Sequence, residues 1–233
     1  MAIAGSAIRE AFQMSMSGSS YGHLSRRVQL AALAMLAALI FAASAAARTL
    51  HVVALGDSLT AGFGLPPGQG FPEVLQKALR AKGYDVEISN AGVSGETAGD
   101  GLARYDWAAP AGTDALIVEL GANDMLRGLD PDAAKKSLGE ILSRARAARI
   151  PTLLTGMRAA PNMGAVYQRR FDAIYPDLAQ SFGVPLYPFF LEGVAGDPKL
   201  NQKDGLHPTR EGVEKIVATI LPSVEELLKG VGK

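Results

Sequence analysis

The chain has 233 residues, enough for one sizeable α/β domain with a full hydrophobic core. Lys and Arg together number 23, and so do Asp and Glu, so no net charge favours nucleic acid or acidic partners. The sequence contains no cysteine, which excludes disulfides, thiolate metal sites, a cysteine nucleophile and a lipid-modified cysteine anchor.

The N-terminal segment has the layout of a secretory signal peptide. Arg26 and Arg27 precede an apolar stretch over residues 28–43, and the small-residue cleavage sites Ala43-Ser44-Ala45 and Ala45-Ala46-Ala47 follow it. The alternative is an uncleaved membrane anchor, but the apolar stretch is short for a span of about 20 residues. We therefore expect residues 1–47 to be a signal peptide, residues 48–233 to form a single domain, and the protein to be periplasmic or secreted without a stable membrane anchor.

After residue 48, short apolar runs alternate with longer amphipathic segments. This alternation predicts a parallel sheet covered by helices on both faces. No internal repeat or change of composition marks a second domain. In chain order we expect a strand over residues 50–55, a helix over 72–81, a strand over 85–89, a helix over 100–108, a strand over 115–119, a helix over 131–148, a strand over 152–155, a helix over 165–182, a strand over 184–186 and a helix over 209–228.

Polar motifs follow the first three of these strands. Gly56-Asp57-Ser58 comes after the first strand, Asn90-Ala91-Gly92 after the second and Gly121-Ala122-Asn123-Asp124 after the third. The carboxyl ends of parallel strands meet at one edge of the sheet, where open α/β folds bind ligands. We therefore expect the three motifs to lie together at that edge.

A serine, an aspartate and a histidine suit nucleophilic acyl transfer. We predict Ser58 as the nucleophile, His207 as its base and Asp204 as the group that orients the histidine ring, because a serine hydroxyl needs an adjacent base. Each residue alone has a plainer interpretation, as a turn serine, a surface histidine or part of an Asp-Gly turn. The rival base is His51, but it opens the first strand and is expected at the opposite edge from Ser58.

Acyl transfer also needs hydrogen-bond donors for the oxyanion that develops on the substrate carbonyl. Our candidates are the backbone N–H groups of Ser58 and Gly92 and the side-chain amide of Asn123. The alternatives are a tight turn at Gly92 and an Asx-turn at Asn123.

Four blocks occur in order along residues 48–233: Gly56-Asp57-Ser58-Leu59, Asn90-Ala91-Gly92-Val93-Ser94-Gly95, Gly121-Ala122-Asn123-Asp124 and Asp204-Gly205-Leu206-His207-Pro208. With these blocks the chain resembles the SGNH hydrolases, also called the GDSL family. The resemblance implies a three-layer α/β/α sandwich of flavodoxin-like type with a five-stranded parallel sheet. It also implies that Ser58 is the nucleophile, that Gly92 and Asn123 complete the oxyanion hole, and that Asp204 and His207 complete the triad.

Residues 118–121, 124–128, 173–176 and 184–190 are similar to bacterial arylesterases, the branch that includes the periplasmic multifunctional thioesterase/lysophospholipase. This resemblance implies an exported, monomeric esterase with a shallow apolar site. It implies substrates among aryl, short-to-medium acyl and lysophospholipid esters, and among acyl-CoA thioesters. Two alternatives stay open: a carbohydrate O-acetylesterase with the same catalytic residues, and a flavodoxin-like ligand-binding protein without catalysis.

Few other residues are available for chemistry. With two histidines after residue 48 and no cysteine, we expect no metal site and no cofactor. Five apolar side chains are candidates to line an acyl pocket, although core packing explains each of them as well. They are Leu59, Met125, Met157, Met163 and Leu206.

Overall fold

The computed structural model describes residues 48–231. The chain divides into two units, Met1–Arg48 and Thr49–Lys233. The predicted signal peptide, residues 1–47, lies outside the described residues, and the second unit carries all the candidate site residues. No helix within the described range is long and apolar enough to cross a membrane.

The second unit is built on a parallel sheet with the flavodoxin-like strand order. The order is β2-β1-β3-β4-β5. Strand β2 is added on one side of β1 and the later strands on the other, so the switch point of the strand order lies between β1 and β3. All neighbouring pairs of strands are parallel. The five strands found within residues 48–231 are β1 (Leu50–Gly56), β2 (Val86–Gly92), β3 (Ala115–Glu119), β4 (Thr152–Thr155) and β5 (Leu186–Tyr187).

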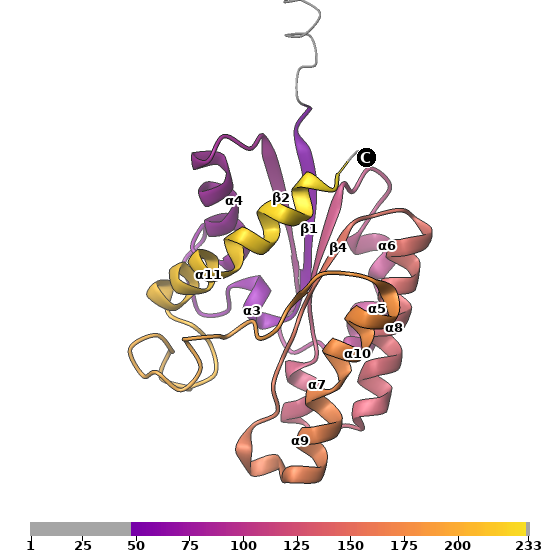
Figure 1. Cartoon of the computed structure of the whole chain (residues 1–233). Helices are drawn as coiled ribbons and strands as arrows, with labels where there is room; N and C mark the ends of the chain where they lie inside the picture. The colour runs from indigo at the N-terminus through magenta and orange to yellow at the C-terminus, as the bar shows by residue number, and fades with distance from the viewer. Residues whose placement is uncertain (1–47, 232–233) are drawn as a thin grey trace, which may run out of the picture. The chain divides into compact units, whose positions relative to one another are not determined.

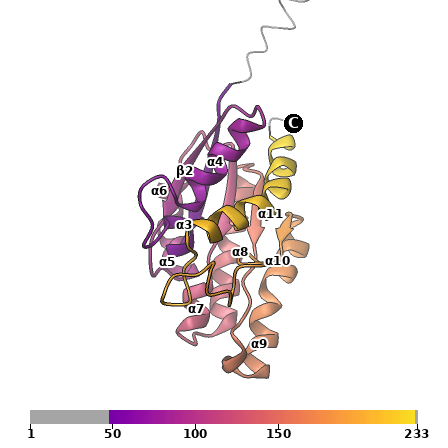
Figure 2. The ribbon, with the colours of Figure 1, turned by 90° about the vertical axis from the view of Figure 1, so that its left-hand side faces the viewer.

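Helices cover both faces of this sheet, which gives the predicted three layers (Figure 1). Helices α4 (Phe71–Ala81) and α11 (Arg210–Lys229) lie together on one face, and Figure 2 shows them in front of the sheet. Helices α5 (Ala98–Ala103), α8 (Pro131–Ala147) and α10 (Ile174–Phe182) lie on the other face. The shorter helices are α3 (Ser58–Ala61), α6 (Tyr105–Ala108), α7 (Ala122–Leu126), the 3-10 helix η1 (Pro161–Met163) and α9 (Ala165–Asp172).

The central strands form the core because helices shield both of their faces from water. Every residue of β3 is buried, and in β1 the run from Val52 to Gly56 is buried. Such strands appear in the sequence as continuous apolar runs rather than as an alternating pattern. The aliphatic side chains of these two strands therefore hold both helical layers on one shared core.

Strand β2 is longer than the sequence predicted. It continues to Gly92 because Asn90, Ala91 and Gly92 pair in register with Ala54, Leu55 and Gly56 of β1. The motif Asn90-Ala91-Gly92 is therefore the end of a strand, and the loop at the sheet edge begins only at Val93.

Two predicted helices are each broken in the structure. The helix expected over 100–108 divides at Arg104 into α5 and α6. The helix expected over 165–182 divides at Ala173 into α9 and α10. Pro176 explains the second break, since it has no N–H to donate to the carbonyl of residue 172 and its ring clashes there.

Two short helices at the carboxyl edge of the sheet were not predicted. Helix α3 begins at Ser58, separated from the end of β1 by one residue, and helix α7 begins at Ala122, separated from the end of β3 by two residues. Because β1 and β3 are neighbours, the first turns of α3 and α7 lie at the same edge. This arrangement brings Ser58 and Asn123 to one site.

Candidate active site

Ser58 lies at the start of α3, where Asp57 caps the helix. The Asp57 carboxylate accepts a hydrogen bond from the N–H of Leu59 at 3.0 Å, which fixes the turn that presents the serine. The Oγ atom of Ser58 is 2.9 Å from Nε2 of His207. The structure therefore brings the predicted nucleophile within hydrogen-bond reach of the predicted base.

Asp204 holds the other side of the histidine ring. Its Oδ2 atom is 2.7 Å from Nδ1 of His207, and its Oδ1 atom accepts the N–H groups of Leu206 at 2.9 Å and His207 at 3.0 Å. The hydrogen bonds from the His207 and Leu206 N–H groups and from the His207 ring lower the pKa of Asp204 to about 2. The carboxylate therefore stays ionised and can accept the Nδ1 proton. Ser58, His207 and Asp204 form a continuous chain of hydrogen bonds.

His51 does not reach this chain. It is the second residue of β1, while Ser58 follows the other end of that strand, so about 20 Å of extended backbone separates the two residues. Its exposed ring lies with Nδ1 3.6 Å from Oε2 of Glu87. Of the two histidines in residues 48–231, His207 is therefore the one at the site.

The geometry does not support Gly92 as an oxyanion donor. Its N–H donates to the side chain of Asn90 at 3.1 Å, and Gly92 is not among the residues that line the cavity beside Ser58. A Cβ atom at this position would overlap the backbone of Ala61 in α3. The glycine is required by that close approach of β2 to α3, which is a structural reason and not a catalytic one.

Gly95 was missed by the sequence prediction and lies on the cavity wall. It sits in the loop after β2 with φ of 85°, a conformation that favours glycine. Within residues 48–231, the N–H groups of Gly95 and Ser58 have no acceptor. Both N–H groups are therefore available to a substrate oxygen.

Asn123 also lines the cavity, and two protein oxygens fix its amide. Its Nδ2 atom donates to Oδ2 of Asp57 at 3.0 Å and to the carbonyl oxygen of Glu96 at 3.0 Å. The side chain does not form the Asx-turn that was its plainer interpretation. The amide is instead held at the cavity wall, in the first turn of α7.

Two carboxyl groups are buried beneath the nucleophile. Asp57 and Glu119 are 0% and 1% exposed, and Oε2 of Glu119 accepts the hydroxyl of Thr60 at 2.8 Å and the N–H of Asp57 at 3.4 Å. Burial raises the pKa of Asp57 to about 6. Burial and, after it, the charge of Asp57 raise the pKa of Glu119 well above its ordinary value. The pair therefore retains a proton under mildly acidic conditions.

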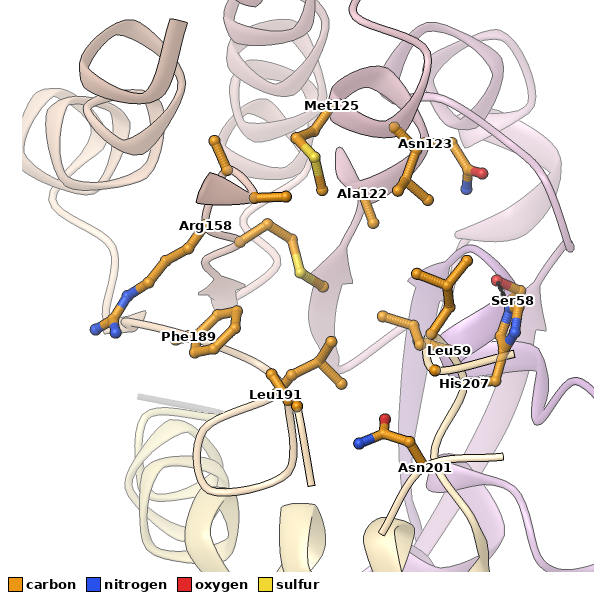
Figure 3. A pocket seen from close by; sticks show the side chains of 18 of the residues that line it. Ser58, Leu59, Ala122, Asn123, Met125, Arg158, Phe189, Leu191, Asn201 and His207 are labelled. Atoms are coloured by element: carbon orange, nitrogen blue, oxygen red, sulfur yellow. Dashed lines mark hydrogen bonds between the residues drawn. The ribbon is translucent and has the colours of Figure 1, made fainter. Parts of the chain in front are cut away.

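A cavity of about 470 Å³ opens beside Ser58 and His207. Figure 3 shows Ser58 and His207 at one end of it and Arg158 and Phe189 at the other. The guanidinium of Arg158 lies 4.9 Å from the centre of the Phe189 ring. Among the side chains that line the cavity, most are apolar, so the site suits a hydrocarbon or aromatic group.

Four of the five candidate pocket residues line this cavity: Leu59, Met125, Met157 and Leu206. Met163 does not, so that prediction is wrong. It belongs to η1, where its partly buried side chain packs against the hydrophobic core, which was the plainer interpretation. The sequence prediction missed several lining residues, although their place after β4 and β5, at the carboxyl edge, was a usable signal. They include Arg158, Phe189 and Leu191.

No group of three or more His, Asp or Glu side chains within the described residues is arranged to hold a metal ion. The hydrogen-bonded serine, histidine and aspartate, on a flavodoxin-like sheet and beside an apolar cavity, are the features of an α/β serine hydrolase.

Comparison with known proteins agrees with this class. Residues 54–215 match the model of the GDSL-like Lipase/Acylhydrolase family. An arylesterase of Vibrio mimicus is 38% identical over 82% of this chain and 95% of its own length. The thioesterase 1/protease 1/lysophospholipase L1 of Escherichia coli is 41% identical over 72% of this chain and 79% of its own. The solved structure of AlinE4, an SGNH-hydrolase family esterase, is 48% identical, with a TM-score of 0.66, over 78% of this chain and 97% of its own.

The chain belongs to the GDSL-like Lipase/Acylhydrolase family and is a carboxylic ester hydrolase. The family and the fold that the four sequence blocks predicted are confirmed.

Proposed function

We propose that the chain hydrolyses carboxylic esters of apolar acyl or aryl groups through an acyl-enzyme on Ser58. The observation that carries this proposal is the 2.9 Å separation of Ser58 Oγ and His207 Nε2 at the mouth of an apolar cavity. The Oγ atom attacks the carbonyl carbon of the ester while Nε2 takes its proton, and ionised Asp204 stabilises the imidazolium that forms.

The tetrahedral intermediate then carries a negative oxygen. We assign its stabilisation to the N–H groups of Ser58 and Gly95 and to Nδ2 of Asn123, which lines the cavity. The two hydrogens of this amide bond Asp57 and Glu96 in the free enzyme, and we propose that one of them also bonds the oxyanion when substrate is bound. The imidazolium returns its proton to the leaving alcohol as the ester bond breaks. Water, deprotonated by His207, next attacks the acyl-enzyme and releases the acid, which restores the Ser58 hydroxyl.

The cavity supports the choice of substrate. Its apolar wall suits an acyl chain or an aryl ring, and its length from Ser58 to Phe189 leaves room for more than an acetyl group. The names of the relatives include arylesterase, thioesterase and lysophospholipase, and we propose aryl, short-to-medium acyl and lysophospholipid esters and acyl-CoA thioesters for this chain. A carbohydrate O-acetylesterase would need polar side chains for the sugar, and the cavity offers few.

We also propose that the enzyme is exported and acts as a monomer formed by residues 48–233. The signal-peptide pattern of residues 1–47 supports export. Expression of the full chain, followed by fractionation and N-terminal sequencing, should give a protein outside the cytoplasm that begins near residue 46 or 48. An unprocessed cytoplasmic protein would contradict export, and a dimer in light scattering would contradict the monomer.

Replacement of Ser58 tests the proposed chemistry. Ser58→Ala should abolish hydrolysis of p-nitrophenyl octanoate and labelling by a fluorophosphonate probe, while thermal unfolding stays close to that of the wild type. Ser94, another serine on the cavity wall, provides the control, because Ser94→Ala should retain both activities. Substantial turnover by Ser58→Ala would overturn the assignment. Faster release of acetate from acetylated sugars than of octanoate from its esters would favour the O-acetylesterase.

A further inference from the structure

Arg104 makes an unusual set of contacts close to the active site. Its side chain is 15% exposed, and it lies at the break between α5 and α6. The Nε atom is 2.6 Å from Oε2 of Glu96, and one terminal nitrogen donates to the carbonyl oxygens of Gly56 at 3.1 Å and Ala91 at 2.8 Å. One guanidinium therefore joins the end of β1 to the end of β2 and to the loop that follows β2.

Each of these three segments leads directly to the site. Gly56 ends β1 and is two residues before Ser58, and Ala91 is the next-to-last residue of β2. Glu96 follows Gly95, which lines the cavity. The N–H groups of Ser58 and Gly95, which we assign to the oxyanion, are therefore carried by segments that Arg104 holds together.

Asn123 is connected to the same arrangement. Its Nδ2 atom donates to the backbone oxygen of Glu96 at 3.0 Å, while the side chain of Glu96 binds Arg104. Glu96 is itself only 17% exposed, so its ion pair with Arg104 is screened less than a surface pair would be. A shift of the Glu96 backbone would move the neighbouring Gly95 and, at the same time, the carbonyl oxygen that holds the Asn123 amide.

The geometry points to Arg104 as a positioning residue of the oxyanion hole, one that sets the spacing between the donors on Ser58, Gly95 and Asn123. This inference rests on the proposed function. A guanidinium suits the task because its planar fork can bond several oxygens in fixed directions, whereas the ammonium group of lysine is a point charge. Donors stabilise an oxyanion only within a narrow range of distance, and a displacement of about 1 Å can reduce the rate about 100-fold.

Arg104→Lys is the test, because it keeps the positive charge and loses the fork. We expect kcat for p-nitrophenyl octanoate to fall by about 100-fold with KM nearly unchanged. A second substrate, the corresponding thionoester, develops its charge on sulfur and benefits less from the donors. The ratio of ester to thionoester rates should therefore also fall in the variant. A residue that only supports the fold would lower the melting temperature without changing this ratio.

Arg80 provides a matched control. Its Nε atom donates to the carbonyl of Val86 at 2.8 Å, at the opposite end of the same strand β2. Arg80→Lys should leave both kcat and the rate ratio at wild-type values. Should Arg104→Lys fail to fold, Glu96→Gln weakens the same contact from the other side and is expected to shift the ratio in the same direction.

The outcomes separate the two proposals. If the wild-type enzyme neither cleaves the ester nor reacts with a fluorophosphonate, the proposed function is wrong. If the wild type is active and both Arg104→Lys and Glu96→Gln keep the wild-type rate ratio, the role of Arg104 in positioning is overturned while the proposed function stands.

Discussion

The side chains of Asn123 and Asp57 are hydrogen-bonded to each other, from Nδ2 to Oδ2 at 3.0 Å, immediately behind the nucleophile. Asp57 also caps the helix that begins at Ser58. One buried carboxylate thus fixes the orientation of the nucleophile and of a side chain that we propose to contact the oxyanion. The two roles are coupled because Asp57 is fully buried and cannot exchange these partners for water.

Asn123→Ala should lower kcat for ester hydrolysis by about 10²–10³-fold, with a small change in KM, because the lost donor acts mainly in the transition state. Steady-state kinetics with p-nitrophenyl esters measures this. Asn90→Ala is the paired control. It frees the N–H of Gly92 from its acceptor, and kcat should stay within a few-fold of wild type since Gly92 is outside the cavity. A clear rise in kcat with Asn90→Ala would restore Gly92 as a donor, because the freed N–H could then bond the oxyanion.

Asp204→Asn should lower kcat by about 10⁴-fold, the loss seen for this change in triad proteases. The amide cannot stabilise the imidazolium and favours the wrong tautomer of His207. Asp197 lies nearby in the sequence and also accepts a backbone N–H, from Lys199 at 2.8 Å, so Asp197→Asn is a control for the loss of charge in a turn. Activity of Asp204→Asn within 10-fold of wild type would mean that another group orients the ring.

Glu119→Gln should change how stability depends on pH. Burial and the charge of Asp57 raise the pKa of Glu119 above its unfolded value of 4.5, so the folded protein binds more protons than the unfolded one as the pH rises through that range. The free energy of unfolding contributed by this group therefore falls with rising pH. Glutamine does not titrate, so the variant lacks this pH-dependent contribution. The difference in melting temperature, variant minus wild type, should therefore increase from acid to neutral pH.

Thermal unfolding over a pH series checks this prediction, with about 2–4 °C expected for each kcal/mol. Exposed Glu140, which pairs with Arg144 at 3.1 Å, gives the control, because Glu140→Gln should show no comparable trend. Parallel curves for Glu119→Gln and wild type would show that Glu119 does not titrate in this range.

Ser58 was predictable because it follows a strand whose apolar run is visible in the sequence, and Asp204 and His207 because an acid and a histidine stand three residues apart. The structure brings Ser58, Asp204 and His207 together, as predicted, although their catalytic roles stay predictions. Gly95 was not predictable in the same way. The length of β2 depends on its pairing with β1, which no local pattern encodes, and this pairing carries Gly92 into the sheet. The proposed oxyanion donor is therefore Gly95, in the loop that follows β2, and not Gly92.

The wall of the cavity was only partly predictable for a related reason. Met157 and Met163 are both methionines in the segment after β4, yet only Met157 faces the cavity. The 3-10 helix that turns Met163 toward the core depends on packing and not on periodicity. Similarly, the side chain at the break, Arg104, reaches the ends of β1 and β2 and the loop after β2, and nothing in the run from 100 to 108 indicates these contacts.

Phe189 should limit the length of the acyl chain that the enzyme prefers. Its ring lies at the end of the cavity away from Ser58, next to Arg158 (Figure 3), whose guanidinium is 4.9 Å from the ring centre. Phe189→Ala lengthens the cavity without touching Ser58 or His207. Each further methylene that becomes buried contributes about 0.8 kcal/mol, or about 4-fold in kcat/KM. The preferred chain should therefore become longer, while acetyl and butyryl esters keep nearly their original rates.

A series of p-nitrophenyl esters from acetate to laurate measures this shift as the chain length at which kcat/KM is highest. Phe182 is the matched control, since it also lies beneath an arginine, Arg146 at 5.1 Å, but outside the cavity. Phe182→Ala should lower stability and leave the preferred length unchanged. If Phe189→Ala instead lowers kcat/KM by the same factor for every chain length, Phe189 supports the structure of the cavity wall and does not limit the length of the acyl chain.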